Sequence, residues 1–189
     1  MEVRMSKPKI ILMMGGQGVG KGTISKMLLA HGDYDYIETG ALLRAAPADS
    51  DVAKTIASGN LVSDAQIFAL ISGNIRDGHN VVLDGSPRTV PQAQWLVENF
   101  ADKYDIYTVY LSVPTEIMLA RINKRVNEGG GRQDDTDSNA IRRRLDAFFN
   151  VTMPAIEWLR NAHGVRFAEI DASGTPESIL SDVLDFVGN

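Results

Sequence analysis

The sequence predicts an α/β protein in which helices cover both faces of a parallel sheet. Short apolar runs alternate along the chain with longer segments whose apolar residues recur at helical spacing. This alternation is typical of parallel sheets, because a helix usually makes the crossover from one parallel strand to the next. The second observation is a glycine-rich turn directly after the first apolar run, at residues 15–20. Together they predict a site at the carboxyl ends of the strands.

Five strands are expected. The first, at residues 10–14, contains no polar residue, as expected for a strand that is buried on both faces. The other four are expected at 34–37, 80–84, 107–111 and 166–171.

Helices are expected between the strands, and residues that favour helix ends mark several of them. Thr39 can cap a helix that reaches Arg44, and Ser63 can cap a longer one that Gly78 ends. Pro114 suits the first turn of a helix that runs to about residue 127. The remaining helical segments are 24–29, 52–58, 89–100, a long one from about 138, and 176–187.

The long helix from about residue 138 is expected to be amphipathic. Its apolar residues recur at helical spacing, which predicts a single buried face. That face is expected to carry Ile141, Leu145, Phe148 and Phe149.

Composition and length fit a single globular domain. The chain has 189 residues, of which 44% are hydrophobic and 23% charged. A formal net charge of −5 gives no general attraction to nucleic acid or to an anionic membrane. The absence of cysteine excludes disulfides and thiolate metal sites and fits a reducing compartment, so a cytoplasmic protein is expected. No apolar run approaches the length of a membrane span, and no secretory signal is visible.

The glycine-rich turn is a candidate phosphate-binding loop, Gly15-Gly16-Gln17-Gly18-Val19-Gly20-Lys21-Gly22-Thr23. An expected strand precedes it and an expected helix follows, which is the context that this motif requires. Glycines let backbone N–H groups turn toward an anion, the helix start adds partial positive charge, and Lys21 supplies a full charge. The spacing departs from the usual pattern, because Gly22 separates Lys21 from Thr23. A glycine-rich turn with an incidental lysine is the alternative interpretation.

Arginines are concentrated in one part of the chain. Six of the twelve lie close together, at Arg121, Arg125, Arg132, Arg142, Arg143 and Arg144. Guanidinium groups stay charged and bind phosphate oxygens in pairs, so a cluster of them suits a site for several phosphates. Asp84, at the end of an expected strand, and Arg88, just after it, are placed to join that site. Arg142 and Arg143 are better explained by an exposed helix face.

The ordered set of motifs resembles the adenylate kinase family of nucleoside monophosphate (NMP) kinases. The resemblance extends from Lys9 to about Gly188. It rests on residues 15–23, 39–44, 59–64, 84–89 with Gln92, Arg121 with Arg125, 132–135, and 144–145. It implies a three-layer P-loop fold, with a parallel five-stranded sheet flanked by helices, a small NMP-binding lobe and a short lid. The chain would be a single kinase domain, 1–189, with the lobe at 39–67 and the lid at 126–137.

The resemblance also implies a reaction and the residues for it. The expected activity is reversible, Mg²⁺-dependent phosphoryl transfer from ATP to AMP, which yields two ADP and balances the adenine nucleotides. The catalytic residues would be Lys21, Arg88, Arg125, Arg132 and Arg144. ATP would be bound by Gly16, Gly18, Val19, Gly20, Lys21, Gly22, Thr23, Arg121 and Arg125, with Arg121 stacked on adenine. AMP would be bound by Thr39, Gly40, Arg44, Asn60, Val62, Gly85, Arg88, Gln92, Arg132 and Arg144.

The implied cofactor is Mg²⁺, and no zinc is expected. Asp84 would anchor the ion through its waters, with Thr23 close to it. The lid would exclude water, which otherwise competes with the acceptor phosphate. The implied partners are the small molecules ATP and AMP, without nucleic acid or membrane, and the protein is expected to be a monomer.

The acceptor remains the most open point. Gln92 favours AMP, because its amide can pair with the adenine edge, and the alternative acceptor is UMP or CMP. A non-catalytic nucleotide-binding regulator is the alternative of another class. A guanine-specific GTPase is disfavoured, because Asn123-Lys124 is not followed by the required Asp.

Several positions depart from the family pattern. Gln17 and Val19 replace a usual proline and serine in the loop, Ala41 replaces a common aspartate, and Ser86 replaces a phenylalanine. The segment between residues 44 and 59 is also shorter than is typical. None of these changes removes a phosphate-contacting charge, so they bear on acceptor geometry and rate rather than on the type of reaction.

Overall fold

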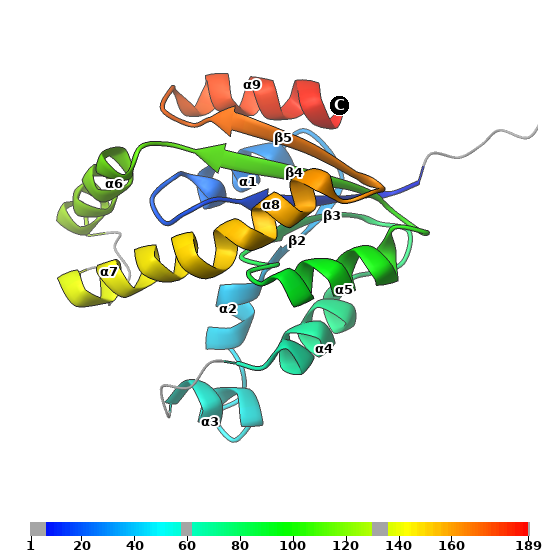
Figure 1. Ribbon diagram of the computed structural model, residues 1–189, viewed down its shortest axis with the longest axis horizontal. Coiled ribbons are helices and arrows are strands. Elements are labelled where there is room, and N and C mark those ends of the chain that lie inside the picture. The colour runs from blue at the N-terminus through cyan, green and yellow to red at the C-terminus, as the bar shows by residue number, and fades with distance from the viewer. Residues whose placement is uncertain (1–6, 58–61, 130–135, 189) are drawn as a thin grey trace, which may run out of the picture.

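A computed structural model describes residues 7–57, 62–129 and 136–188 of the chain. At its centre is a five-stranded sheet in the order β2-β3-β1-β4-β5, in which every pairing is parallel (Figure 1). The strands are β1 (Lys9–Met14), β2 (Tyr34–Glu38), β3 (Asn80–Asp84), β4 (Asp105–Ser112) and β5 (Val165–Asp171). All five expected strands are present, and the predicted three-layer α/β class is confirmed.

Two layers of helices cover the sheet, and strand β1 shows why both faces are buried. Its alternate side chains point to opposite faces, as pleating requires. Ile10, Leu12 and Met14 pack in the cluster that includes the apolar residues of α5 (Val90–Phe100) and α8 (Met153–Asn161). Ile11 and Met13 pack instead with α1 (Lys21–Leu29) and α9 (Pro176–Val187).

The remaining helices lie at the edges of this core. Below the sheet in Figure 1 are α2 (Thr39–Arg44), α3 (Asp51–Ala57) and α4 (Asp64–Asn74), and at the left end are α6 (Thr115–Asn127) and α7 (Ser138–Ala147). The expected NMP lobe at 39–67 includes α2 and α3. Residues 58–61 of that lobe and 130–135 of the expected lid lie outside the described part. No helix within the described ranges combines the length and apolar character that crossing a bilayer requires.

The expected helix ends are partly right. Ser63 caps α4 in a reciprocal pair with Gln66, so this expectation is confirmed. The helix ends at Asn74, before Gly78, because the chain turns at Ile75 to enter β3. The expected cap at Thr39 is wrong. Glu38 is the N-cap of α2 without a side-chain hydrogen bond, and Thr39 is already helical and 1% exposed.

Helices α7 and α8 form one long rod, joined by the π-helical turn η2 (Phe148–Thr152). The rod crosses the front of Figure 1 from yellow to orange. The expectation that Phe149 shares the buried face is wrong, since it is 45% exposed whereas Phe148 is 7% exposed. A π turn holds an extra residue and therefore rotates the side chains that follow it away from α-helical register.

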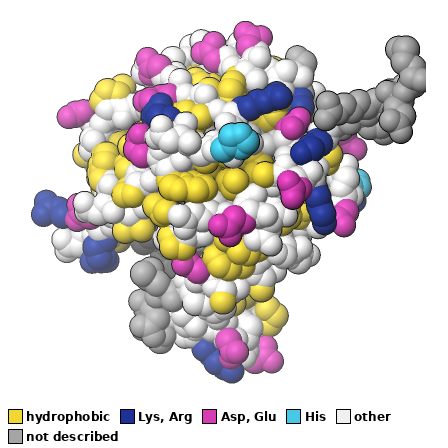
Figure 2. Space-filling model, turned by 45° about the vertical axis from the view of Figure 1, so that its right-hand side comes forward, with side chains coloured by type: hydrophobic (Ala, Val, Ile, Leu, Met, Phe, Trp, Pro, Cys, Tyr) yellow, Lys and Arg dark blue, Asp and Glu magenta, His cyan; other side chains and the backbone are white. Residues whose placement is uncertain are grey.

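The surface shows no single-sign charge pattern on the face in Figure 2. Apolar side chains form a band across the middle of that face, and Lys, Arg, Asp and Glu side chains are interspersed around it. Within the described residues, the exposed large apolar side chains are Leu119, Phe149 and Val151. Positive and negative side chains are thus mixed on this face.

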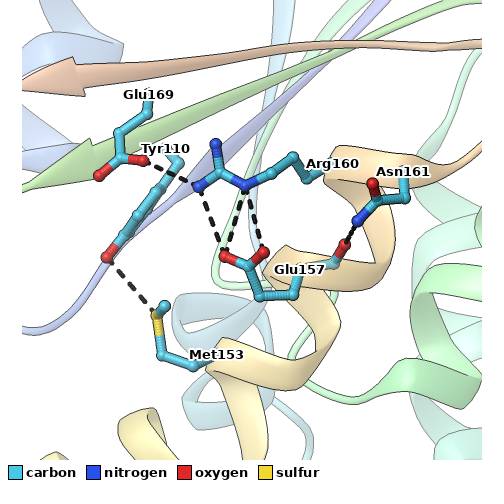
Figure 3. A network of polar contacts seen from close by, with 6 residues as sticks. All are labelled: Tyr110, Met153, Glu157, Arg160, Asn161 and Glu169. Carbon is cyan, nitrogen blue, oxygen red and sulfur yellow. Dashed lines mark hydrogen bonds and ion pairs between the residues drawn. The ribbon is translucent and has the colours of Figure 1, made fainter.

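A polar network covers the outer part of the sheet beneath α8 (Figure 3). Arg160 donates to Glu169 over 2.8 Å and to Glu157 over 3.2 Å, and its guanidinium lies 4.3 Å from the centre of the Phe167 ring. Tyr110 donates to the Met153 sulfur over 3.5 Å, and burial raises the pKa of its hydroxyl. The network thus ties α8 to β4 and β5.

Replacing Arg160 with methionine is expected to lower the free energy of unfolding by about 1 kcal/mol, because a half-exposed ion pair and a cation–π contact are lost together. Urea unfolding followed by circular dichroism measures the change. Arg142→Met, on an exposed helix face, is the matched control and should change stability little. An equal effect of both variants would contradict a structural role for this network.

Candidate active site

The expected site residues converge because the strands are parallel. Glu38 at the end of β2 pairs in register with Asp84 at the end of β3. Asp84 also pairs with Met13 of β1, whose neighbour Met14 pairs with Tyr110 of β4. The loops that leave these strands therefore begin at one edge of the sheet, as the sequence predicts.

The phosphate loop has a backbone that only glycine tolerates at two points. Gly15 has a φ of 140° and Gly18 a φ of 79°. A Cβ atom at Gly15 would lie 2.6 Å from the carbonyl oxygen of Leu111, and one at Gly18 would lie 2.6 Å from that of Met118. The loop therefore packs with its backbone against the end of β4 and against α6, and side chains are excluded there.

Lys21 opens α1 and points back over the loop. Its Nζ donates to the carbonyl oxygens of Gly15 over 2.7 Å and Gly16 over 3.0 Å. Gly20, the N-cap of α1, offers no side-chain cap, so the first N–H groups of this helix are directed toward the loop without a capping side chain. Thr23 lies exposed in the first turn. This arrangement of a cation and backbone N–H groups suits a chain of phosphates.

Helix α7 lies along the other side of the loop. Gln17 donates from Nε2 to the carbonyl oxygen of Ile141 over 3.1 Å, and the Phe148 ring lies 3.4 Å from the position of a Cβ on Gly16. Arg144 precedes Phe148 by four residues, so the two share a helix face. Arg144 is half-buried. Gln17, one of the residues that depart from the family pattern, thus links the phosphate loop to α7.

A pocket of about 360 Å³ opens beside the loop and α6. Thr23, Arg121 and Arg125 line it, as expected for an ATP site. Arg121 donates to the carbonyl oxygens of Val19 over 3.1 Å and Ala172 over 2.8 Å. It therefore also fixes the phosphate loop to the segment after β5, a role that the resemblance does not imply.

The far wall of this pocket was not predicted. It comes from Gly174, Pro176 and Ile179, at the turn after β5 and the start of α9. A Gly-Thr-Pro turn at the carboxyl end of the last strand is the signal that could have identified it, because every strand end of a parallel sheet faces the same edge.

A second group of residues surrounds Gly40 and Gly85. The position of a Cβ on Gly85 lies 3.6 Å from Nη2 of Arg88 and 3.7 Å from the backbone nitrogen of Gly40. A Cβ on Gly40 would lie 3.1 Å from Nη1 of Arg44. Arg88 is oriented by its Nε, which donates to the Gly85 carbonyl over 2.9 Å. Two guanidinium groups and two small residues thus lie together after β2 and β3, an arrangement that suits a phosphate.

Gln92 and Thr39 are fixed beside this second site. The Gln92 side chain is 7% exposed, accepts from the Arg88 backbone over 2.8 Å and donates to Asp64 over 2.7 Å. Its amide keeps one N–H and one lone pair beyond these bonds. The Cβ atom of Thr39 lies 3.8 Å from the position that a Cβ would take on Gly85.

Three other expected acceptor-site residues are less defined. Val62 is half-buried and packs against the core. Asn60 and Arg132 lie outside the described residues, so their expected roles stay predictions.

Asp84 suits the expected magnesium site. It is 7% exposed and accepts a hydrogen bond from Tyr36 over 3.2 Å. Burial, together with the Asp84 and Glu38 charges, raises the pKa of Tyr36, so its hydroxyl stays a donor. Mg²⁺ keeps several waters and binds through one or two carboxylates and substrate phosphates, and a single oriented carboxylate matches this need. Within the described ranges, no three His, Asp or Glu side chains cluster as a metal site of their own.

A parallel sheet with a phosphate loop after β1, and a pair of arginines after β2 and β3, is typical of a P-loop phosphotransferase. A family model described as adenylate kinase matches residues 13–163. The chain belongs to the adenylate kinase family and is a nucleoside monophosphate kinase, an ATP-binding transferase that acts on nucleotides.

Similar proteins span nearly the whole chain. An adenylate kinase from Maricaulis maris is 33% identical, covering 92% of this chain and 95% of its own length. An adenylate kinase from Bacteroides thetaiotaomicron is 31% identical, covering 94% of this chain and 97% of its own length. One from Mesoplasma florum is 28% identical, covering 92% of this chain and 98% of its own length.

Proposed function

We propose that this protein transfers a phosphoryl group reversibly from ATP to AMP and so balances the adenine nucleotides. The observation that carries the proposal is a pair of cationic sites at the carboxyl ends of neighbouring parallel strands. One is the loop with Lys21, and the other holds Arg44 and Arg88 around Gly40 and Gly85. An enzyme that moves a phosphoryl group between two phosphates needs two such sites at one edge of the sheet.

The residues act by position and charge. Lys21 binds the outer phosphates of ATP, while Arg44 and Arg88 hold the phosphate of the acceptor. Arg125 and Arg144 approach from α6 and α7 and stabilise charge on the phosphoryl group in transit, as Arg132 does from the lid at 126–137. The acceptor phosphate is already ionised near neutral pH, so no general base is needed.

Asp84 would hold the magnesium ion that accompanies ATP, with Thr23 nearby, and the bound ion would supply neutralisation of phosphate charge. Tyr36 keeps the carboxylate of Asp84 in one orientation. The lid at 126–137 and the NMP lobe at 39–67 exclude water when they close. The protein works as a monomer in the cytoplasm.

The wild-type protein is expected to prefer AMP over UMP and CMP by at least about tenfold in kcat/KM, because a pyrimidine leaves the remaining Gln92 groups unpaired. A coupled assay of ADP formation from ATP and each monophosphate measures this. Gln92→Ala should reduce the preference, chiefly by raising the KM for AMP.

Two comparisons make the assay decisive. Gln92 also supports Arg88, so the variant should weaken all monophosphates somewhat, and the ratio between them is the informative quantity. Gln94→Ala, on the exposed side of the same helix, should leave the ratio unchanged. Equal use of UMP or CMP by the wild type would remove AMP as the preferred acceptor and leave phosphoryl transfer intact. Formation of no diphosphate from any acceptor would contradict the proposed reaction.

A further inference from the structure

We infer that Glu38 is an intramolecular competitor for the acceptor phosphate, which sets how tightly every nucleoside monophosphate binds. The inference rests on the proposed function, because it concerns the acceptor site. Its basis is an ion pair that neither the motifs nor the family match assigns, between Glu38 and the phosphate-binding Arg44.

The carboxylate of Glu38, the N-cap of α2, reaches Arg44 at the other end of this short helix. Oε1 of Glu38 lies 3.1 Å from Nη2 of Arg44. The same guanidinium places Nη1 3.1 Å from the Cβ position of Gly40, so it lies over the glycine that borders the acceptor site. Glu38 is therefore bound to Arg44 at the place where a phosphate would be bound.

The surrounding charges make this contact costly for an incoming phosphate. Arg44 and Arg88 bring two positive charges to Gly40 and Gly85, and Glu38 cancels one of them. Asp84, in register with Glu38 on the next strand, adds a further carboxylate at this edge. The phosphate of AMP must therefore compete for the Arg44 donors and approach a carboxylate of like charge.

The competition predicts a specific pattern of affinities. It acts on the phosphate and not on the base, so it weakens AMP, UMP and CMP by one common factor. Adenosine carries no phosphate, so Glu38 should not weaken its binding. ATP is proposed to bind at Lys21 and in the pocket beside α6, whose lining does not include Arg44, and is also unaffected.

The opposite role is also physically possible, and the sign of the effect separates the two. If Glu38 served only to orient Arg44 for phosphate, removing its charge would weaken AMP binding. A competitor gives tighter binding when its charge is removed. High salt should also reduce the difference in the Kd for AMP between the wild type and a variant without this charge. Salt screens the ion pair because it is exposed, with side-chain exposures of 58% for Arg44 and 34% for Glu38.

The test is Glu38→Gln, which keeps the shape of the side chain and removes its charge. Isothermal titration calorimetry with AMP, UMP and adenosine, in the absence of ATP, is expected to show Kd values for AMP and UMP that fall about two- to fivefold. The Kd for adenosine and the KM for ATP should not change. Glu98→Gln, an exposed carboxylate on α5, is the matched control and should change none of them.

Two results would overturn the inference, namely an unchanged or raised Kd for AMP, or an equal gain for adenosine. Circular dichroism confirms that each variant is folded. Binding is measured without turnover, so failure of the inference can be told apart from failure of the proposed reaction. If no ADP is formed but the Glu38→Gln variant binds AMP more tightly, the proposed reaction is contradicted and the inference about Glu38 stands.

Discussion

The Lys21→Met variant is expected to fold normally and to lose turnover by about 10²- to 10⁴-fold, the scale of removing one preorganised charge from a phosphoryl-transfer site. Lys21 is the cation held against Gly15 and Gly16 at the start of α1. Methionine has a similar length and apolar stem but brings no charge to the phosphates. The kcat should fall much more than the affinity for AMP, because the proposed AMP site is the one at Arg44 and Arg88.

Steady-state kinetics with circular dichroism measures this effect. Lys26→Met, an exposed lysine on the same helix, is the matched control and should retain full activity. Near-normal turnover in a folded Lys21→Met protein would remove Lys21 from the mechanism.

The Gly18→Ala variant is expected to lose about 2 kcal/mol or more of stability, since an L-residue is strained at this positive φ and its backbone clash adds to that strain. The φ of Gly18 is 79°, and a Cβ would lie 2.6 Å from the carbonyl oxygen of Met118. Relief of the clash would move the loop away from α6. Affinity for ATP should therefore fall along with stability.

Gly73→Ala is the matched control for this substitution. Gly73 lies within α4, and a Cβ there would meet nothing within 4 Å. Alanine should stabilise the protein by about 0.5–1 kcal/mol, because it reduces the conformational freedom of the unfolded chain. Urea unfolding, with titration of a non-hydrolysable ATP analogue, measures both variants. A Gly18→Ala protein as stable as the wild type would show that the loop does not require this backbone conformation.

The sequence predicted the layers and the phosphate loop because both depend on local signals. Apolar runs, glycines and helix periodicity are each visible within a few residues. The π turn at η2 could not be predicted in this way, since the apolar spacing from Ile141 to Phe149 is the spacing of an ordinary α-helix. Its register follows from packing between Phe148 and the phosphate loop.

Side-chain pairs between distant segments were equally out of reach. Gln92 was expected to contact the base, but its bonds to Asp64 and to the Arg88 backbone depend on how α4 and α5 pack. The ion pair between Glu38 and Arg44 depends on the path of the chain at the start of α2, where Thr39 was wrongly expected to be the cap. Such contacts are set by tertiary geometry and not by residue type.

The rod made by α7, η2 and α8 has a mechanical consequence. One end is clamped in the core, where Ala155, Ile156 and Leu159 are each 0% exposed. Arg144 lies on the other arm, about 16 Å away at the helical rise of 1.5 Å per residue. A tilt of about 5° at the clamp would displace that arm by about 1.4 Å at such a length, and about 1 Å of misplacement is enough to slow a reaction a hundredfold. The apolar packing beneath α8 therefore helps to set the position of the Arg144 guanidinium at the other end of the rod.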